Sequence, residues 1–365
     1  MKTNPFVSPS FVWYAFPVGE NMKKENALFL PMIIVAVLVF MLSFVIGRYS
    51  VNPFTAVKIL LSKGLELITG NRYTLSHTWT STEEVVVINI RFPRIVAAFM
   101  IGAALSLSGA SYQAIFRNPM VSPDLLGASS GAGFGAAIAL LLGANYFEVT
   151  LSSFVFGLSA VLLAILISRL SPINQTLAFV LAGVIVSSLF SSATSFIKLI
   201  ADTESTLPAI TYWLMGSLSS IKMKDLAFAF FPLVIGAVPI ILLRWRINLL
   251  SLSDSEARSM GVNTSRLRVV IVLSSTLMTA AAVSISGMIG WVGLVIPHFS
   301  RLLIGVDNRK VVPSSMLLGG TFLLFVDNLA RIITTSELPL GILTSFIGAP
   351  VFLYLIITGG REDEA

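Results

Sequence analysis

The sequence contains no cysteine, only two histidines and few charged residues. Without cysteine the chain has no disulfides, no thiolate metal ligands and no cysteine nucleophile. His77 and His298 are too few to build a histidine-rich metal site. Charged residues make up 12% of the 365 positions, whereas soluble domains carry about 25%. So few charges cannot cover a soluble surface of this size, which excludes an ordinary soluble globular protein.

The chain is instead rich in apolar residues. They account for 55% of the chain, and its mean hydropathy is +0.89. Apolar runs of about the length that crosses a bilayer recur with short polar breaks. They predict an all-α polytopic integral membrane protein with about ten transmembrane helices, near residues 28–47, 94–115, 125–143, 149–168, 177–200, 226–243, 268–288, 291–305, 314–333 and 340–358.

The distribution of basic residues predicts the orientation. The net charge is +6, but lysine and arginine are dispersed, so we expect no nucleic-acid partner. Their densest group, within residues 244–268, falls inside if both termini are cytoplasmic, as the positive-inside rule requires. We therefore predict an N-terminal cytoplasmic extension over residues 1–26 and a transmembrane domain over residues 27–365.

An internal repeat is visible at one constant offset. Residues 103–109 read AALSLSG and residues 281–287 read AAVSISG. Pro119 and Pro297, and Gly127 and Gly305, match at the same offset. The two copies lie five predicted spans apart, so the second copy is inverted. Inverted repeats interrupted by glycine and proline are typical of transporters, whose pathway lies at the repeat interface.

Two kinds of motif bear on helix packing and helix breaks. The run GASSGAGFGA at 127–136 resembles a phosphate loop, but no Gly-Lys-Ser/Thr follows it. Small residues at this spacing favour close helix packing in lipid, so any ATP must come through a partner. RNPMVSP at 117–123 and VIPHFSR at 295–301 each predict a helix break at proline, either lining a cavity or as a surface loop.

Ionisable residues inside predicted spans are costly and therefore informative. Asp327 is the one acid deep in a span, and Arg331 follows one helical turn later. An Asp327–Arg331 ion pair and a proton or ion site are both open. His298 lies next to Pro297 near a helix end, where we expect a packing or capping role.

Two polar segments suit contacts with other proteins. Residues 249–268 are amphipathic and lie between two spans, which favours a short cytoplasmic helix that docks a soluble partner over a solvated loop. Arg91 and Arg94 begin the second predicted span on the outside. They fit either snorkelling anchors or a cluster that receives carboxylates of an external protein.

These segments together resemble one family. RFPRIVAAFMIGAALSLSGASYQAIFRNPMVSPDLLGASSGAG, SEARSMGV, SGMIGWVGLVIPHFSRLLIGVDNRKVVP, DNLAR and ELPLGILTSFIGAPVF are similar in order and spacing to the FecCD-type ABC importer permeases. The motifs cover most of residues 91–358. The resemblance implies the type II importer fold and a dimer of this chain with itself or with a related permease. It also implies two ATPase subunits inside and a substrate-binding protein outside.

The resemblance also implies residue roles. It places the coupling helices that press on the ATPase at about 250–262, with Leu250, Ser253, Glu256, Ala257, Arg258 and Gly261. It matches Arg91, Arg94 and Arg331 to outer arginines that pair with glutamates of the binding protein. It matches Asn118 and Met120 to the first part of an inner gate and Thr176 and Leu177 to the second, although the family has small polar residues where this chain has Leu177. Apart from the resemblance, Ser106, Ser108, Ser111, Gln113 and Met120 are candidate pathway residues that would suit many large ligands.

The resulting prediction is a multi-pass permease of a prokaryotic cell membrane that imports a ferric siderophore or similar iron chelate. Haem and cobalamin are alternative cargoes of the same importer type. A proton-coupled secondary transporter centred on Asp327 is a more distant alternative, and an intramembrane enzyme lacks a pair of catalytic groups. We expect the chain to be non-catalytic and to bind no metal or cofactor, with ATP and Mg²⁺ used by the partner ATPase.

Overall fold

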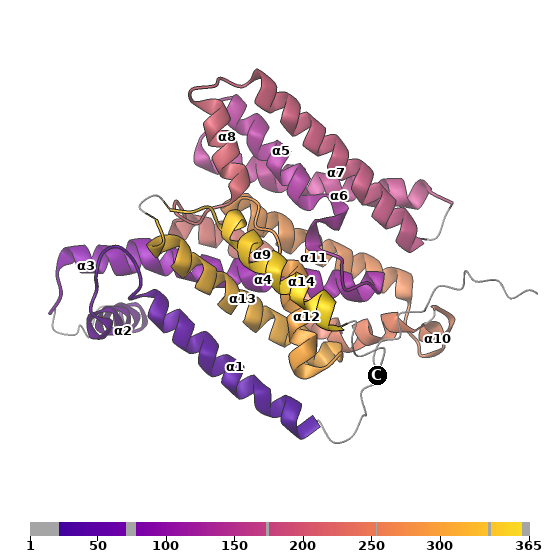
Figure 1. The fold of residues 1–365 in the computed structure, drawn as a ribbon, viewed down its shortest axis with the longest axis horizontal. Helices are drawn as coiled ribbons and strands as arrows, with labels where there is room; N and C mark the ends of the chain where they lie inside the picture. The colour runs from indigo at the N-terminus through magenta and orange to yellow at the C-terminus, as the bar shows by residue number, and fades with distance from the viewer. Residues whose placement is uncertain (1–21, 71–77, 173–174, 253, 335–336, 360–365) are drawn as a thin grey trace, which may run out of the picture.

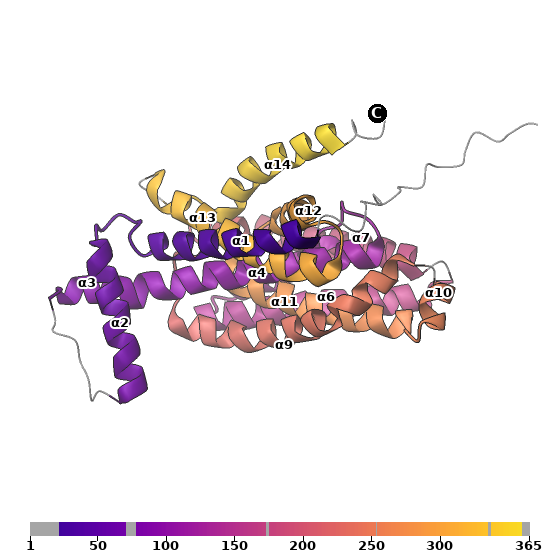
Figure 2. The ribbon, with the colours of Figure 1, turned by 90° about the horizontal axis from the view of Figure 1, so that it is seen from below.

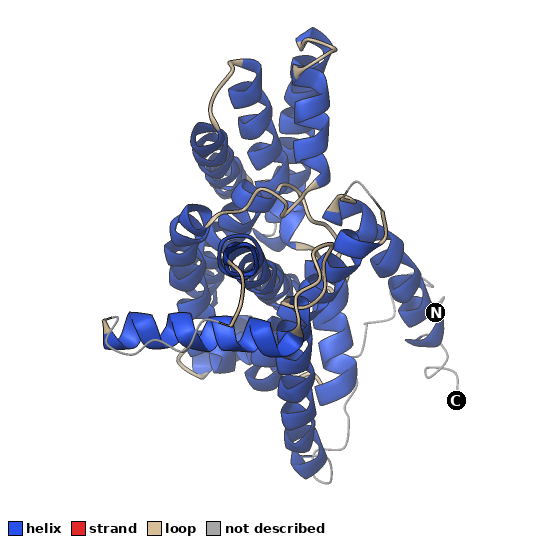
Figure 3. Ribbon diagram, turned by 90° about the vertical axis from the view of Figure 1, so that its left-hand side faces the viewer, coloured by secondary structure: helices blue, strands red, loops and turns tan. Residues whose placement is uncertain are grey.

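The computed structural model describes residues 22–70, 78–172, 175–252, 254–334 and 337–359, and within them all regular structure is helical (Figures 1 and 3). In chain order the helices up to the middle are α1 (Met22–Ser43), α2 (Pro53–Thr69), α3 (Ser81–Val85), the π-helix η1 (Val86–Arg91), α4 (Phe92–Phe116), the 3₁₀ helix η2 (Pro123–Leu126), α5 (Ala128–Leu141), α6 (Tyr146–Leu170) and α7 (Gln175–Ile200). The remainder are α8 (Thr206–Met215), α9 (Met223–Asn248), the 3₁₀ helix η3 (Leu249–Ser251), α10 (Asp254–Ser259), α11 (Thr264–Ser286), α12 (Val292–Ile304), α13 (Asn308–Ile332) and α14 (Leu340–Gly359).

Each of the ten predicted spans coincides with a helix: α1, α4, α5, α6, α7, α9, α11, α12, α13 and α14. Six helical stretches in the described chain are long and apolar enough to cross a membrane, and four more are shorter. The third and eighth spans are short, with 14 residues in α5 and 13 in α12. The predicted extension lies outside the described residues up to residue 21, and its boundary at residue 26 stays a prediction.

Two features of the fold differ from the predictions. The polar segment 48–93 holds α2 and also α3 and η1, which extend α4 outward to give one helical stretch of 36 residues. The predicted helix break at Pro297 is wrong, because this proline lies inside α12. The break in 117–123 is confirmed: α4 ends before Arg117, which has φ 51°, and Pro123 starts η2.

Hydrogen bonds at one end of the bundle fix the helix directions. Arg117, just after α4, donates from Nε to the carbonyl of Leu250 at 2.6 Å, so α4 ends where α9 ends. Asn248 donates from Nδ2 to Asp307 Oδ1 at 2.7 Å, so α13 begins there too. We call this the α10 end and the opposite one the α3 end. Since α4 runs toward the α10 end and α11 away from it, the two repeat copies are antiparallel, which confirms the inverted repeat.

The core forms around α4 and α11, which pack directly against each other (Figure 1). Small residues allow close approach: a Cβ on Gly102 of α4 would lie 2.2 Å from the carbonyl oxygen of Gly319 in α13. The glycine-rich α5 packs in the same way on α6, where a Cβ on Gly131 would lie 2.5 Å from the Phe156 oxygen. This confirms helix packing for the glycine-rich run.

The outer helices leave their apolar side chains exposed. Of the apolar stretch of α11, 78% is buried, whereas only 28% is buried in α7 and in α9. In Figure 2, α14 lies along one edge of the bundle and α9 along the opposite edge. Apolar surface on this scale at the rim of a bundle requires lipid or another subunit to cover it.

Candidate functional site

A buried charge cluster occupies the α3 end, between α4 and α13. Arg94 donates from Nε to Asp327 Oδ1 at 2.9 Å and from Nη1 to Glu337 Oε1 at 2.8 Å. Arg331 Nη2 lies 3.0 Å from Asp327 Oδ2. Asp327 is fully buried between the two guanidinium groups, whereas the Glu337 side chain is 26% exposed. The arrangement neutralises a buried carboxylate, because an unpaired one would be very costly there.

Arg331 of this cluster and the nearby Arg91 donate hydrogen bonds to the end of α1. Arg91 donates from Nη1 to the carbonyl oxygens of Phe44 and Val45, the latter at 3.3 Å. Arg331 donates from Nη1 to the oxygens of Ser43 and Ile46, both at 3.1 Å. The last carbonyls of a helix lack partners within it, so these side chains close the α1 end and fasten it to α4 and α13.

The predicted Asp327–Arg331 pair is confirmed, but two partners of the cluster were missed. Arg94 is far from both Asp327 and Glu337 in the sequence, and no local pattern links it to them. Arg91, Arg94 and Arg331 are all buried and bonded within the chain. Their contact with an external binding protein stays a prediction, and it requires that Glu337 or the α1 carbonyls release them.

At the α10 end the predicted coupling segment is helical and half-exposed. Leu250 in η3 and Ala257 in α10 are fully buried, and Glu256 and Arg258 beside Ala257 are exposed. Gly261 follows with φ 79°, the left-handed geometry that ends a short helix. Ser253 lies outside the described residues. The segment thus presents charged side chains outward and is anchored by apolar ones.

Arg117 joins this segment to the core helix α4. Besides its bond to Leu250, it donates from Nη2 to the carbonyl of Leu252. Both acceptors lie in the link between α9 and α10. These bonds tie the link before α10 to α4, which packs on α11, α12 and α13. Sequence reasoning missed this residue, because only the tertiary structure brings it to the link.

The predicted inner-gate residues lie at the α10 end. Met120 and Leu177 are 53% and 51% exposed, Asn118 is exposed, and Thr176 is half-buried. The Asn118 Oδ1 accepts the backbone N–H of Met120 at 2.9 Å, which fixes the turn after α4. The described residues leave Met120 and Leu177 about half exposed, so both side chains are accessible on the surface that the structure describes.

The predicted pathway residues of α4 lie elsewhere. Ser108 is fully buried and donates from Oγ to the Ser275 carbonyl at 3.2 Å. Gln113 is also fully buried: its Nε2 donates to the Leu294 carbonyl at 3.1 Å, and its Oε1 accepts from Arg301 Nη1 at 2.5 Å. Ser106 and Ser111 are buried as well. These contacts join α4 to α11 and α12, which argues against a direct pathway role in this conformation.

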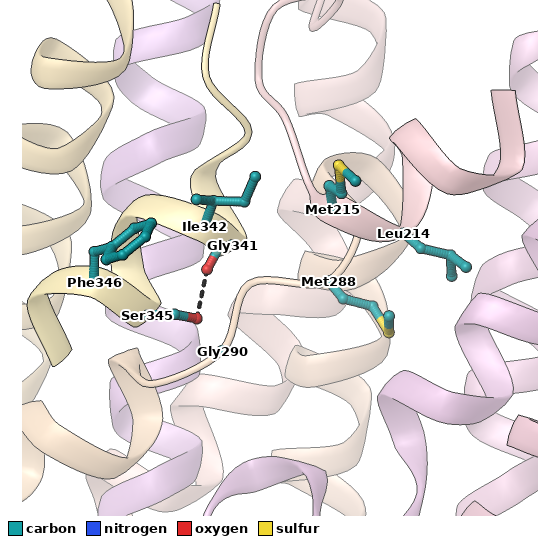
Figure 4. A pocket seen from close by; sticks show the side chains of 8 residues that line it. All are labelled: Leu214, Met215, Met288, Gly290, Gly341, Ile342, Ser345 and Phe346. Atoms are coloured by element: carbon teal, nitrogen blue, oxygen red, sulfur yellow. Dashed lines mark hydrogen bonds between the residues drawn. The ribbon is translucent and has the colours of Figure 1, made fainter. Parts of the chain in front are cut away.

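An open apolar hollow of about 610 Å³ lies at the α3 end, between α8, α14 and the link from α11 to α12 (Figure 4). Ser345 contributes a hydroxyl, but its Oγ donates to the Gly341 carbonyl at 2.7 Å. No charged side chain is among the described residues that line the hollow. The lining residues are Leu214, Met215, Met288, Gly290, Gly341, Ile342, Ser345 and Phe346.

Other candidate chemistry finds little support in the described residues. The His298 ring packs edge-on against Phe352, with 6.3 Å between centroids, as expected for a packing histidine. No group of three or more histidine, aspartate or glutamate side chains that could hold a metal ion is found among the residues with described positions.

Comparisons with known proteins agree with this geometry. A model described as the FecCD transport family matches residues 34–358. The molybdate import system permease MolB of Haemophilus influenzae is 39% identical over 321 residues, covering 87% of this chain and 92% of that protein. A probable iron chelatin transport system permease of Helicobacter pylori is 44% identical over 276 residues, covering 76% and 83%. A solved structure described as an inward-facing metal-chelate type ABC transporter matches with TM-score 0.79 and 38% identity, covering 91% of this chain and 99% of that one.

Proposed function

Because this chain belongs to the FecCD transport family, we propose that it forms the membrane pathway for an iron chelate, with a ferric siderophore as cargo. The chain is an ABC importer permease and a multi-pass membrane protein. The observation that carries the choice of cargo is the apolar hollow at the α3 end. A ligand pocket without charged side chains suits a bulky chelate whose metal is already enclosed.

Molybdate is the second candidate cargo, favoured by the likeness to MolB. A small oxyanion is normally held by cationic side chains or clustered N–H donors. The lining of the hollow offers neither a lysine nor an arginine. Haem and cobalamin, which are also bulky metal chelates, are alternatives within the same importer type.

The charge difference between the two ends supports an orientation with the α10 end in the cytoplasm. The α10 end carries more basic residues than acidic ones: Arg117, Arg169, Arg244, Arg246, Arg258, Arg266, Arg268, Arg301, Arg309 and Lys310 against Asp124, Asp254, Glu256 and Asp307. Among the described residues of the α3 end the two signs balance: Arg48, Lys58, Lys63, Arg91, Arg94, Lys198, Lys222, Lys224 and Arg331 against Glu66, Glu83, Glu84, Glu148, Asp202, Glu204, Asp225, Asp327 and Glu337. The described ends of α1 and α14, at residues 22 and 359, then face the cytoplasm.

The proposed mechanism couples this orientation to ATP use by a partner. Two ATPase subunits bind ATP and Mg²⁺ and press on η3 and α10 of two permease chains. Arg117 passes the displacement to α4, and the repeat helices change their packing. A substrate-binding protein delivers the chelate at the α3 end. The chain itself carries out no covalent chemistry, and differential binding to the two conformations directs the transport.

The experiment is ATP hydrolysis and uptake by this chain in proteoliposomes with its ATPase and binding protein. We expect uptake of ⁵⁵Fe-labelled siderophore that depends on ATP, and no uptake of radioactive molybdate. Glu256→Lys combined with Arg258→Glu should release the ATPase, because both side chains lie exposed on α10. The matched control is Arg266→Glu, exposed at the same end but in the first turn of α11. Molybdate uptake would reverse the choice of cargo, and uptake without ATP would refute the importer mechanism.

A further inference from the structure

Helix α2 lies crosswise to the long helices of the bundle. Figure 2 shows it projecting from the α3 end toward the side away from α14. It packs against η1, and the Lys63 Nζ reaches Glu84 Oε1 of α3 at 2.8 Å and Glu66 Oε2 at 2.9 Å. Since the long helices cross the membrane, α2 runs parallel to the membrane plane.

The length of α4 sets the level at which α2 lies. Its 25 residues span about 37 Å at 1.5 Å per residue, more than the roughly 30 Å of the hydrocarbon core. The π-helix η1 continues α4 outward from Arg91. Both η1 and the helix packed on it therefore lie at the level of the lipid headgroups.

The outward face of α2 is apolar, unlike that of a helix on a soluble surface. A stripe of apolar side chains at helical spacing faces outward: Phe54, Val57, Leu61, Leu65 and Ile68, which are between 38% and 85% exposed. An amphipathic helix on a soluble surface turns its charged face outward instead. An apolar stripe that no described residue covers marks a site for another partner.

The opposite face of α2 is mixed: Ala56 and Ile59 pack into the hydrophobic core, and polar groups lie beside them. Ser62 is fully buried, and its Oγ donates to Glu66 Oε1 at 3.3 Å. Bonds to Glu84 and Glu66 raise the pKa of Lys63. The charged groups of this face are thus occupied within the chain, and the free side of the helix is apolar.

We propose that α2 is an interfacial helix whose stripe enters the boundary between headgroups and acyl chains of the leaflet at the α3 end. The apolar surface continues along the chain from the exposed Met41 and Leu42 of α1 to Tyr49 and Phe54. Exposed Lys58 borders the stripe. Tyrosine and lysine beside an apolar face are typical of membrane-interface segments. The proposal rests on the chain crossing a membrane and not on the identity of its cargo.

The test uses the absence of cysteine, which allows a single nitroxide label at a chosen site. Leu61→Cys and Ile68→Cys are labelled in the full chain with its ATPase, in nanodiscs of phosphatidylethanolamine and phosphatidylglycerol. Thr203→Cys, in the exposed loop before α8, is the aqueous control, and Ile235→Cys in the middle of α9 is the hydrocarbon control. We expect the two α2 labels to lose collisions with a water-soluble nickel chelate and to retain collisions with oxygen, at a depth between the two controls.

Two results would overturn the proposal. One is nickel accessibility at both α2 labels equal to that of the Thr203 label. The other is shielding that appears only after the purified binding protein is added, which would make the stripe a protein-docking surface. ATP hydrolysis by the same samples tests the importer function separately, so a failure of either idea is recognised on its own.

Discussion

The buried position of Asp327 leads to a quantitative prediction for Asp327→Asn. This change removes one negative charge that faces Arg94 and Arg331. Arg94 keeps its two bonds to Glu337, at 2.8 and 2.9 Å. Arg331 keeps only neutral partners, namely carbonyl oxygens of the α1 end and the Asn328 side chain. The loss therefore falls mainly on Arg331, which stays buried without a counter-charge.

Removal of one partner from a buried ion pair costs about 3–5 kcal/mol. The entropy of unfolding is about 2.1 cal/mol/K per residue, or roughly 0.8 kcal/mol per degree for this chain of 365 residues. We therefore expect the melting temperature of the permease–ATPase complex to fall by about 4–6 °C. Fluorescence-detected size exclusion of heated samples measures this shift. Glu204→Gln, an exposed acid at the same end, is the control and should leave the melting temperature unchanged.

The same variant separates the structural role from a proton site. If Asp327 only neutralises arginines, the surviving Asp327→Asn complex retains ATP-driven uptake at temperatures below its melting point. An unchanged melting temperature together with complete loss of uptake would refute this reasoning. It would also restore the secondary-transport hypothesis, in which protonation of Asp327 drives the cycle.

Three further changes test other parts of the structure. Arg117→Gly keeps the left-handed backbone position but removes the charge-assisted bonds to the α9–α10 link, which are worth about 1.5–3 kcal/mol each. In proteoliposomes, uptake should fall while basal ATP hydrolysis persists. Gly102→Ala should destabilise the complex by about 1–3 kcal/mol, because the added methyl overpacks the contact with α13. Gly64 has open space around it, so Gly64→Ala should be neutral or stabilising by up to about 1 kcal/mol. The melting temperature of each variant measures the effect. Bonds to Glu84 and Glu66 raise the pKa of Lys63 above its ordinary 10.5. The stabilisation of α2 by these bonds is therefore complete below pH 10.5 and is lost as the pH rises through the raised pKa. A spin label on α2 should gain mobility only above that raised pKa.

Short-range physics explains how much could be predicted from the sequence. Long apolar runs predict a membrane helix wherever they occur. Each predicted span therefore coincides with a helix, although only six described helical stretches are long and apolar enough to cross a membrane. The repeat offset between 103–109 and 281–287, combined with an odd number of spans, specified the inverted arrangement. The pairing of Asp327 with Arg331 was also accessible, because four residues bring two side chains together on any helix.

What the sequence by itself determined, then, was a ten-helix inverted-repeat membrane protein with a polar segment at 249–268. Only the tertiary structure decided which polar residues are enclosed. Ser108 and Gln113 suited a pathway by type, yet contacts across α4, α11 and α12 bury them. Arg94 meets Glu337 only because α4 and α13 run antiparallel. The stripe of α2 faces outward because Ala56 and Ile59 pack into the core and Lys63 pairs with Glu84 of α3. These features depend on contacts between segments far apart in the chain, and no local pattern encodes such contacts.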